Sequence, residues 1–319
     1  KEVVLKDDEI KSINKLIDYI ALTHSPVLET VFFSRSHLYA QELPRRLRDL
    51  FYDFKYNEAS LAILIKNAPF DEQNIIDTPS EYREYEKKFS LTNADIFHGL
   101  FSSLLGEPIA FSSQRRGHII NSIIPLKELE NISNSSSGST YDFQFHTEDA
   151  FHEGIPDYLG LICMRNYEKA PTVISHIQNH QFPEDIKRIL FEEKFIINSN
   201  PIHENLNIKE RQTKKSILFG NLKAPYLRIN LNNMNTKSYS KLQKEAIDYL
   251  INVIDKNQIK IILEQGNCLY IDNFRTVHRR NAYKPLYGKS ARWLTRIVTT
   301  NDLRKTRHLR TESYNRVIS

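Results

Sequence analysis

The sequence has little of the residues that several common protein classes require. Its two cysteines, Cys163 and Cys268, are too few for a disulfide scaffold and form no C-x-x-C pair. Its nine glycines form neither a P-loop nor a G-x-G-x-x-G segment, which argues against a nucleotide-binding α/β fold. No apolar run approaches the roughly 18 residues of a membrane span, and the first residues do not resemble a signal peptide. These absences predict a soluble, cytoplasmic protein without membrane contact.

An excess of charge of one sign is also lacking. The chain carries 44 Lys and Arg against 39 Asp and Glu, a net charge of +5. The densest basic run, residues 304–310, has no interleaved aromatic residues, so we expect a solvated end segment and no nucleic-acid partner. What the chain does have is a hydrophobic content of 40%, with 11% aromatic residues, enough to bury a large core.

Apolar residues at helical spacing predict three helices, which start near Asp8, Thr92 and Ser240. Asp95 and Gln243, three residues after Thr92 and Ser240, predict a capping box at each of these two starts. Short β-type runs separated by polar turns fill the rest of the chain. They comprise residues 118–124, 159–164, 172–175, 268–271 and 292–298. This pattern is typical of a mainly β sandwich or barrel with flanking helices. We therefore expect one domain over residues 1–319, with a helical part over about 1–110 and a β core over about 111–300.

Two segments are expected to be loops. Residues 131–140 are short and rich in serine, which is typical of a flexible connection. Residues 200–222 are polar and irregular, and they lie between β-type runs. An insertion of that length is often an active-site lid, although composition alone favours a variable surface loop equally.

His146 and Glu148 form the first candidate site, because they stand two residues apart in a β-type run. On a strand, alternate side chains point to one face, so this imidazole and this carboxylate can converge on one metal ion. With a distant second histidine they would form the two-histidine, one-carboxylate arrangement that leaves three open positions on Fe(II). Taken alone, H-x-E is a common chance match.

His278 is the candidate for the second histidine. It follows a predicted strand and turn, and Arg292 and Arg296 come after it at strand-like spacing. A guanidinium can grip a carboxylate bidentately inside a barrel. Taken singly, His278 could be a surface histidine beside Arg279 and Arg280, and Arg292 could be a salt-bridge partner. Together, these residues favour a metal site with an anion nearby.

Several short segments are shared with one known family. They are residues 146–151, 157–161, 165–166, 272–273, 277–279 and 292–296. These segments resemble the clavaminate synthase-like Fe(II)/2-oxoglutarate oxygenases. Within that family the chain is most similar to the branch that hydroxylates free amino acids, including the viomycin arginine hydroxylase and bacterial lysine hydroxylases, and residues 42–47 match it too. The resemblance spans nearly the whole chain and implies a double-stranded β-helix core, the jelly roll of cupin-like proteins.

The resemblance implies three iron ligands, His146, Glu148 and His278, with 2-oxoglutarate and O2 as cosubstrates. Arg292 corresponds to the arginine that grips the distal carboxylate of 2-oxoglutarate, and Thr172 to a threonine that helps to hold it. The reaction implied is oxidative decarboxylation of 2-oxoglutarate coupled to hydroxylation of the substrate. Related halogenases have Gly or Ala at the carboxylate position, so Glu148 favours hydroxylation.

The resemblance also implies contacts to an amino-acid substrate. Gln114 corresponds to a residue that holds the substrate α-amine together with Glu148. Ser136 corresponds to a serine on the α-carboxylate, and Arg296 to a second arginine that pairs with the same group. An amino acid anchored in this way brings C3 or C4, which are unactivated side-chain carbons, over the iron.

Asn230 and Asn232 depart from the family pattern. The arginine-specific branch has two aspartates here, which clamp the guanidinium of the substrate. Two neutral amides cannot supply that charge, so we expect L-lysine first, then citrulline, with arginine or another polar amino acid as further alternatives. Asp149, Glu204 or Glu210 could face a lysine ammonium, and amides suit a ureido group.

A second class of protein shares these features. A jelly-roll protein that only binds a ligand could keep the fold without catalysis. The complete set of His146, Glu148, His278 and Arg292 argues against that alternative. The sequence leaves the oligomeric state open, a homo-oligomer included.

Overall fold

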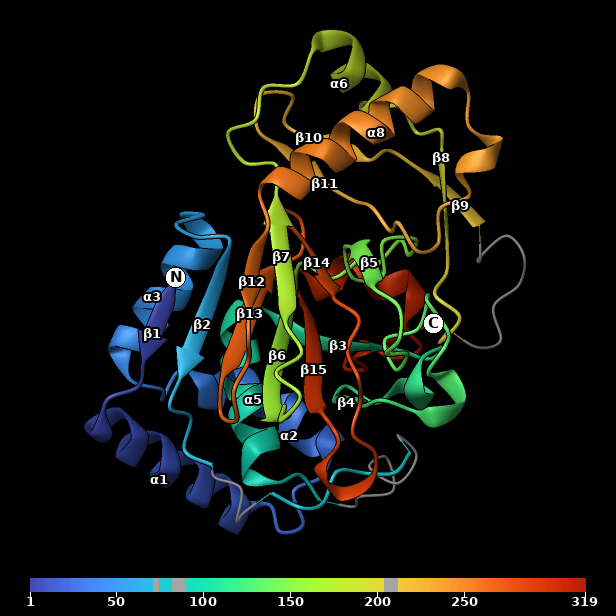
Figure 1. Ribbon diagram of the computed structural model, residues 1–319. Coiled ribbons are helices and arrows are strands. Elements are labelled where there is room, and N and C mark those ends of the chain that lie inside the picture. Colours follow the sequence, from blue (N-terminus) through green and yellow to red (C-terminus); the bar gives the residue numbers. More distant parts are fainter. Residues whose placement is uncertain (71–74, 82–89, 204–211) are drawn as a thin grey trace.

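Figure 1 shows the computed structural model of the protein, which describes residues 1–70, 75–81, 90–203 and 212–319. Two β-sheets lie at its centre, and helices lie outside both. The strands of the larger sheet are β1 (Glu2–Val4), β2 (Ala62–Lys66), β3 (Glu107–Phe111), β4 (Asn121–Ile123), β6 (Tyr158–Arg165), β13 (Cys268–Asp272), β15 (Trp293–Thr300) and β16 (Val317–Ile318). They run in the order β1-β2-β13-β6-β15-β3-β16, and β4 pairs with β15.

The smaller sheet runs in the order β12-β7-β14-β5. Its strands are β5 (Phe143–His146), β7 (Thr172–His176), β12 (Ile259–Ile261) and β14 (Thr276–Arg280). All of its pairings are antiparallel. The two sheets form the jelly-roll core that the sequence predicted.

Four helices cover one face of the larger sheet, at the bottom and left of Figure 1. They are α1 (Asp7–Thr23), α2 (Glu29–Ala40), α3 (Arg45–Tyr56) and α5 (Asn93–Leu105). The predicted start at Thr92 is confirmed, because its hydroxyl accepts the N–H of Asp95 at 3.3 Å while the Asp95 carboxylate accepts the N–H of Thr92. This reciprocal cap satisfies backbone donors that the first helical turn leaves free.

A second group of elements packs on the smaller sheet, at the top of Figure 1. It comprises α6 (Glu184–Phe191), α8 (Lys241–Lys256) and two hairpins, β8 (Phe195–Asn198) with β9 (Gln212–Lys215) and β10 (Leu218–Gly220) with β11 (Pro225–Leu227). The predicted capping box at Ser240 begins α8. Short 3-10 turns lie at Arg115–Gly117, Lys127–Leu129, Thr236–Ser238, Gly288–Ser290 and Leu303–Leu309.

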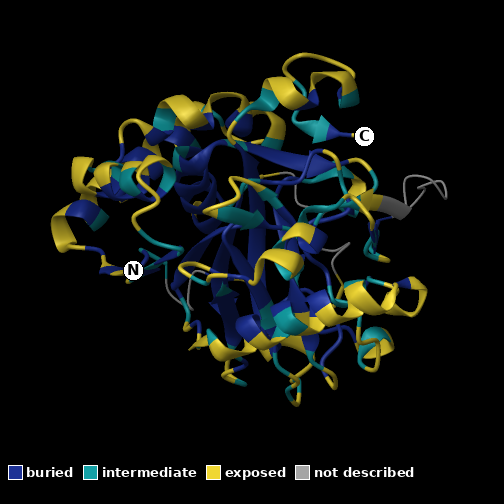
Figure 2. Cartoon of the chain, turned by 90° about the horizontal axis from the view of Figure 1, so that it is seen from above, coloured by how far each residue is buried: buried dark blue, intermediate teal, exposed yellow. Residues whose placement is uncertain are grey.

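Alternation along β15 divides the core into layers. Trp293 and Ile297 point into the cluster under the helices, whereas Leu294 and Val298 point into the cluster between the two sheets. Because side chains on a strand alternate between faces, even-numbered residues of β15 face the smaller sheet. Figure 2 shows the buried strands at the centre and the exposed residues on the outer elements. The space between the sheets is therefore where inward polar side chains can form a site.

Two boundaries differ from the simple division expected from the sequence. The N-terminal part also supplies β1 and β2, which join the larger sheet through β13. The segment 200–222, expected to be an irregular loop, contains the strands β9 and β10 in its described part, and residues 204–211 lie outside the described residues. Within the described part of the chain, no helix is both long and apolar enough to cross a membrane.

Arg275 ties the larger sheet to the end of α3. Its Nε donates to Asp272 at 2.7 Å, and its other nitrogens reach the carbonyls of Glu58 and Ser60. Burial raises the pKa of the Asp272 carboxyl even though Arg275 opposes this. Replacing Arg275 with Met leaves that carboxyl buried without an ion pair, with only the backbone N–H groups of Phe274 and Arg275 as donors. We expect the free energy of unfolding to fall by about 3–5 kcal/mol, measured by urea denaturation.

The control for this prediction is Arg45→Met. Arg45 pairs with Asp49 at 3.5 Å, but both side chains are exposed. An exposed pair of this kind contributes roughly 0–1 kcal/mol. Equal losses for the two variants would contradict a structural role for the buried pair.

Candidate active site

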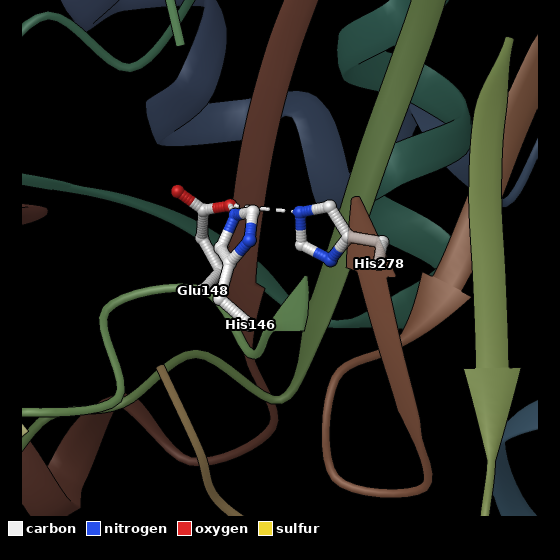
Figure 3. A group of neighbouring side chains, drawn as sticks. All are labelled: His146, Glu148 and His278. Atoms are coloured by element: carbon white, nitrogen blue, oxygen red, sulfur yellow. Dashed lines mark ion pairs between the residues drawn. The ribbon is translucent and has the colours of Figure 1, made fainter. Parts of the chain in front are cut away.

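Three ligand groups meet between the sheets. His146 ends β5, His278 lies within β14, and these two residues are register partners on neighbouring strands. The Glu148 carboxylate lies 4.0 Å from His146 Nε2 and 3.4 Å from His278 Nε2. One ligand atom from each residue lies within 4.8 Å of the others, and Figure 3 shows the three side chains converging. As the sequence predicted, His278 follows a strand and a turn, which are β13 and residues 273–275, and it lies within the next strand, β14.

Backbone contacts hold these groups in position. His146 Nδ1 lies 2.9 Å from the carbonyl oxygen of Gln144. Since a carbonyl only accepts, Nδ1 carries the hydrogen and Nε2 is free to bind a metal. The Asn273 side chain accepts the N–H of Glu148 at 2.7 Å and donates to its carbonyl at 3.2 Å. Asn273 is fully buried, so it fixes the backbone of Glu148 from the opposite segment.

Burial and charge set the protonation states. Burial, helped by His278, lowers the pKa of His146 to about 4, so its imidazole is neutral at neutral pH. Burial alone would raise the pKa of Glu148, but the Arg296 guanidinium and the two histidines lower it below its usual range. Two imidazole nitrogens and one carboxylate oxygen are the donor set that suits a non-haem Fe(II). The residues present therefore fit the metal that the sequence implied.

Arg296 and Gln114 adjoin the metal ligands. The Arg296 guanidinium contacts the Glu148 carboxylate and donates to Gln114 Oε1 at 2.5 Å. All three side chains are buried. The sequence assigned each of them a role toward the amino acid, and the structure places them side by side.

A cavity between the sheets contains most of the predicted site. Alternation on β15 directs Leu294 and Arg296 into it, and Arg292, just before the strand, also lines it. The other predicted residues that line it are Gln114, Ser136, His146, Glu148, Thr172 and His278. Ser136 comes from the predicted loop 131–140, and Asn200 and Ile202 come from the start of the 200–222 segment.

Asn230 and Asn232 are not among the described residues that line this cavity. They lie beside it, because Asn230 forms a β-bridge with His146. The Asn232 side chain accepts the N–H of Gln144 at 2.9 Å and donates to its carbonyl at 3.2 Å. The two asparagines thus extend the edge of β5, next to the metal ligands.

Sequence reasoning missed two features of the site. Arg280 lines the cavity two residues after His278, although its sequence resembles a basic surface run. His203, which is 1% exposed, bridges Asp149 Oδ1 and Ser113 Oγ, both at 2.8 Å. This bridge links the segment after Glu148 to the one before Gln114. Isolated histidines carry no sequence signal for such a role.

Residues 62–298 match the family described as taurine catabolism dioxygenase TauD, TfdA family. The chain belongs to the TauD/TfdA family. Enduracididine beta-hydroxylase of Streptomyces hygroscopicus is 29% identical over 98% of both chains. The L-ornithine/L-arginine 3-hydroxylase of Catenulispora acidiphila is 27% identical over 88% of both chains.

More distant relatives and solved structures agree with this assignment. An L-lysine 4-hydroxylase of Chitinophaga pinensis is 24% identical over 79% of this chain and 68% of that protein. The crystal structure of the non-heme iron oxygenase OrfP in complex with Fe and alpha-ketoglutaric acid has a TM-score of 0.91, with 28% identity and full coverage of both chains. This TauD/TfdA member is therefore a dioxygenase of the amino-acid hydroxylase group that uses Fe(II), 2-oxoglutarate and O2.

The residues of this TauD/TfdA site have three roles, which are metal binding, exclusion of water and binding of carboxylates. His146, Glu148 and His278 would hold the iron, which when bound couples oxidative decarboxylation of 2-oxoglutarate to succinate with hydroxylation of the substrate. The surrounding apolar side chains, including Leu159, Leu161 and Leu294, exclude water from the reacting groups. The buried arginines can bind carboxylates without losing their charge.

Proposed function

We propose that this chain hydroxylates C3 or C4 of a free L-α-amino acid with a long polar side chain, and that its substrate is L-lysine. The observation that carries the proposal is the pair Arg292 and Arg296, which line one cavity four residues apart. At about 3.3 Å per residue the two positions are separated by roughly 13 Å along the strand. Two arginines whose backbone positions lie so far apart on one strand suit two separate carboxylates, which 2-oxoglutarate and an amino acid supply.

The amino-acid end of the cavity is the one beside Glu148. Arg296 and Ser136 would bind the α-carboxylate, while Gln114 Oε1 and Glu148 would accept from the α-ammonium. Support comes from the existing contacts of Arg296 with Gln114 and Glu148, which put a cation and two acceptors at one place. An amino acid held there by its α-groups places its first side-chain carbons next to the metal ligands.

The 2-oxoglutarate end of the cavity is the one beside Arg292. Arg292 and Thr172 would bind the distal carboxylate, and both side chains are buried and line the cavity. The Arg292 Nε has no hydrogen-bond partner within the described structure. A buried guanidinium with a free donor is a good binding group for a carboxylate.

The relatives favour a basic side chain on the substrate, whereas the residues that line the cavity favour a neutral polar one. The relatives' names include ornithine, arginine and lysine, which are basic amino acids and support lysine. One observation favours citrulline as the second candidate: among the described lining residues, Glu148 is the sole carboxylate. Asp149 is bonded to His203, and Glu204 and Glu210 lie outside the described residues.

A substrate panel tests the proposal. Purified enzyme with Fe(II), 2-oxoglutarate and O2 would be given lysine, ornithine, arginine, citrulline, asparagine or the apolar amino acid leucine. Succinate formation and mass spectrometry of the amino acid would be measured together. We expect lysine to give the largest coupled signal, with one oxygen atom added at C3 or C4. A larger signal with citrulline would replace lysine, and a product from an apolar amino acid alone would contradict the proposal.

We expect the double variant Asn230→Asp and Asn232→Asp to raise turnover of arginine relative to lysine by about tenfold. Two carboxylates at the edge of β5 would attract a guanidinium, and 1.4 kcal/mol of preference is tenfold. Competition between the two amino acids in one reaction measures the ratio. Asn235→Asp is the control, because Asn235 is exposed and aspartate caps the following turn equally well. An unchanged ratio would place side-chain selection outside these asparagines.

A further inference from the structure

Two buried guanidiniums share the cavity without an acidic partner. Arg280 is 7% exposed and Arg292 is 3% exposed. Their Cζ atoms lie 5.2 Å and 5.8 Å from the centre of the Tyr283 ring. Among the described residues neither arginine forms an ion pair, and the Nε of each has no hydrogen-bond partner. The Glu168 carboxylate accepts the backbone N–H groups of Leu286 and Arg292, and among the described residues it forms no ion pair with either guanidinium.

Like charges repel strongly where water is scarce, so a buried pair without an anion is costly. Arg280 Nη1 donates to the carbonyl of Asn281 at 3.0 Å, which compensates only part of that cost. A carboxylate placed between the two guanidiniums would relieve the repulsion. The pair therefore has the electrostatics of an anion site.

Strand geometry places this pair relative to the metal. His278 and Arg280 are two residues apart on β14, so both side chains point into the cavity, about 6.6 Å apart along the strand. Arg280 is also the register partner of Thr172 on β7. Directly opposed residues on neighbouring strands share one face, so the Thr172 hydroxyl and the Arg280 guanidinium lie on the same side.

We propose that Arg280 is a second binding residue for the distal carboxylate of 2-oxoglutarate, and that with Arg292 and Thr172 it sets the preference for a five-carbon dicarboxylic 2-oxo acid. The inference rests on the use of 2-oxoglutarate and on the role proposed above for Arg292. Two methylene groups separate the keto carbon of this cosubstrate from its distal carboxylate. A 2-oxo acid held by its keto end beside His278 would therefore have its distal carboxylate within reach of Arg280, farther along the strand.

The alternative is that Arg280 is structural and only joins β14 to the carbonyls of Asn281 and Ser139. The two roles differ in what they predict for the ligand. A binding residue acts through the distal carboxylate alone. A structural residue would weaken every 2-oxo acid to the same extent.

The test is a double-mutant type of cycle, in which one change removes the Arg280 guanidinium and the other removes the distal carboxylate of the ligand. Mn(II)-loaded wild type and Arg280→Met would be titrated by calorimetry with 2-oxoglutarate and with 2-oxopentanoate, which has a methyl group in place of the distal carboxylate. We expect Arg280→Met to weaken 2-oxoglutarate about 10- to 100-fold, the range of a hydrogen bond to a charged group. The dissociation constant for 2-oxopentanoate should differ by less than about twofold between wild type and Arg280→Met.

Further variants control for the loss of a buried arginine. Arg228→Met removes a half-buried guanidinium that stacks on Phe219, away from this cavity, and should leave both affinities unchanged. Arg280→Lys keeps the charge and should recover most of the preference for 2-oxoglutarate, which also serves if Arg280→Met does not fold. Equal weakening of both acids, or no weakening, would overturn the proposal. Failure of the wild type to bind 2-oxoglutarate would instead overturn the function on which it rests.

Discussion

Replacing His146, Glu148 or His278 with alanine is expected to abolish 2-oxoglutarate-dependent turnover and tight Fe(II) binding while the chain stays folded. Each residue supplies one of three ligand atoms that lie within 4.8 Å of one another. Loss of an outer hydrogen-bond partner of a ligand typically costs 10- to 100-fold, so loss of a ligand itself should cost more than about 100-fold. Succinate formation, anaerobic titration with Fe(II) and circular dichroism measure the three quantities.

Two variants make this expectation specific. His152→Asn changes a half-buried histidine of the same segment, whose Nδ1 accepts the N–H of Gly154, and should keep both activity and metal binding. Asn273→Ala removes the clamp on the Glu148 backbone and should give an intermediate loss of roughly 10- to 100-fold. Near-normal activity in any of the three ligand variants would remove that residue from the metal site.

Local patterns in the sequence predicted the elements that depend on local physics. Capping residues at Thr92 and Ser240 predicted where α5 and α8 begin, because a cap acts within one helical turn. Helix α3 carries its own helical pattern at Leu47, Leu50 and Phe51 and could have been predicted in the same way. Helix α2 has little amphipathic pattern, since Phe32, Phe33 and Ser36 are all buried. Its position depends on packing against α5.

The inward polar residues were harder to predict. An inward arginine in a strand contradicts the usual pattern of apolar core positions, so Arg280 resembled part of a basic surface. Its placement follows from the pairing of β14 with β5 and β7, which brings together segments more than a hundred residues apart. The positions of Asn230 and Asn232 beside Gln144 likewise depend on long-range register. That register cannot be predicted from the spacing of residues along the chain.

Replacing Arg292 and replacing Arg296 should each raise a KM strongly, but for a different ligand. We expect Arg292→Met to raise the KM for 2-oxoglutarate about 100-fold or more and to change the KM for the amino acid little. Truncating one partner of a buried ion pair costs roughly 3–5 kcal/mol, which corresponds to factors of roughly 10² to 10⁴. Steady-state kinetics with each ligand varied in turn measures the separation.

Arg296→Met should show the opposite pattern. Its guanidinium contacts Glu148 and Gln114, so its loss removes the cation proposed for the α-carboxylate of the amino acid. It also removes the main attraction that lowers the pKa of Glu148, so some loss of Fe(II) affinity should accompany the higher KM for the amino acid. Each variant serves as the control for the other, because both replace a buried arginine that lines the same cavity with methionine. If the two variants exchanged phenotypes, the assignment of the two carboxylate sites would be reversed while the metal site stayed in place.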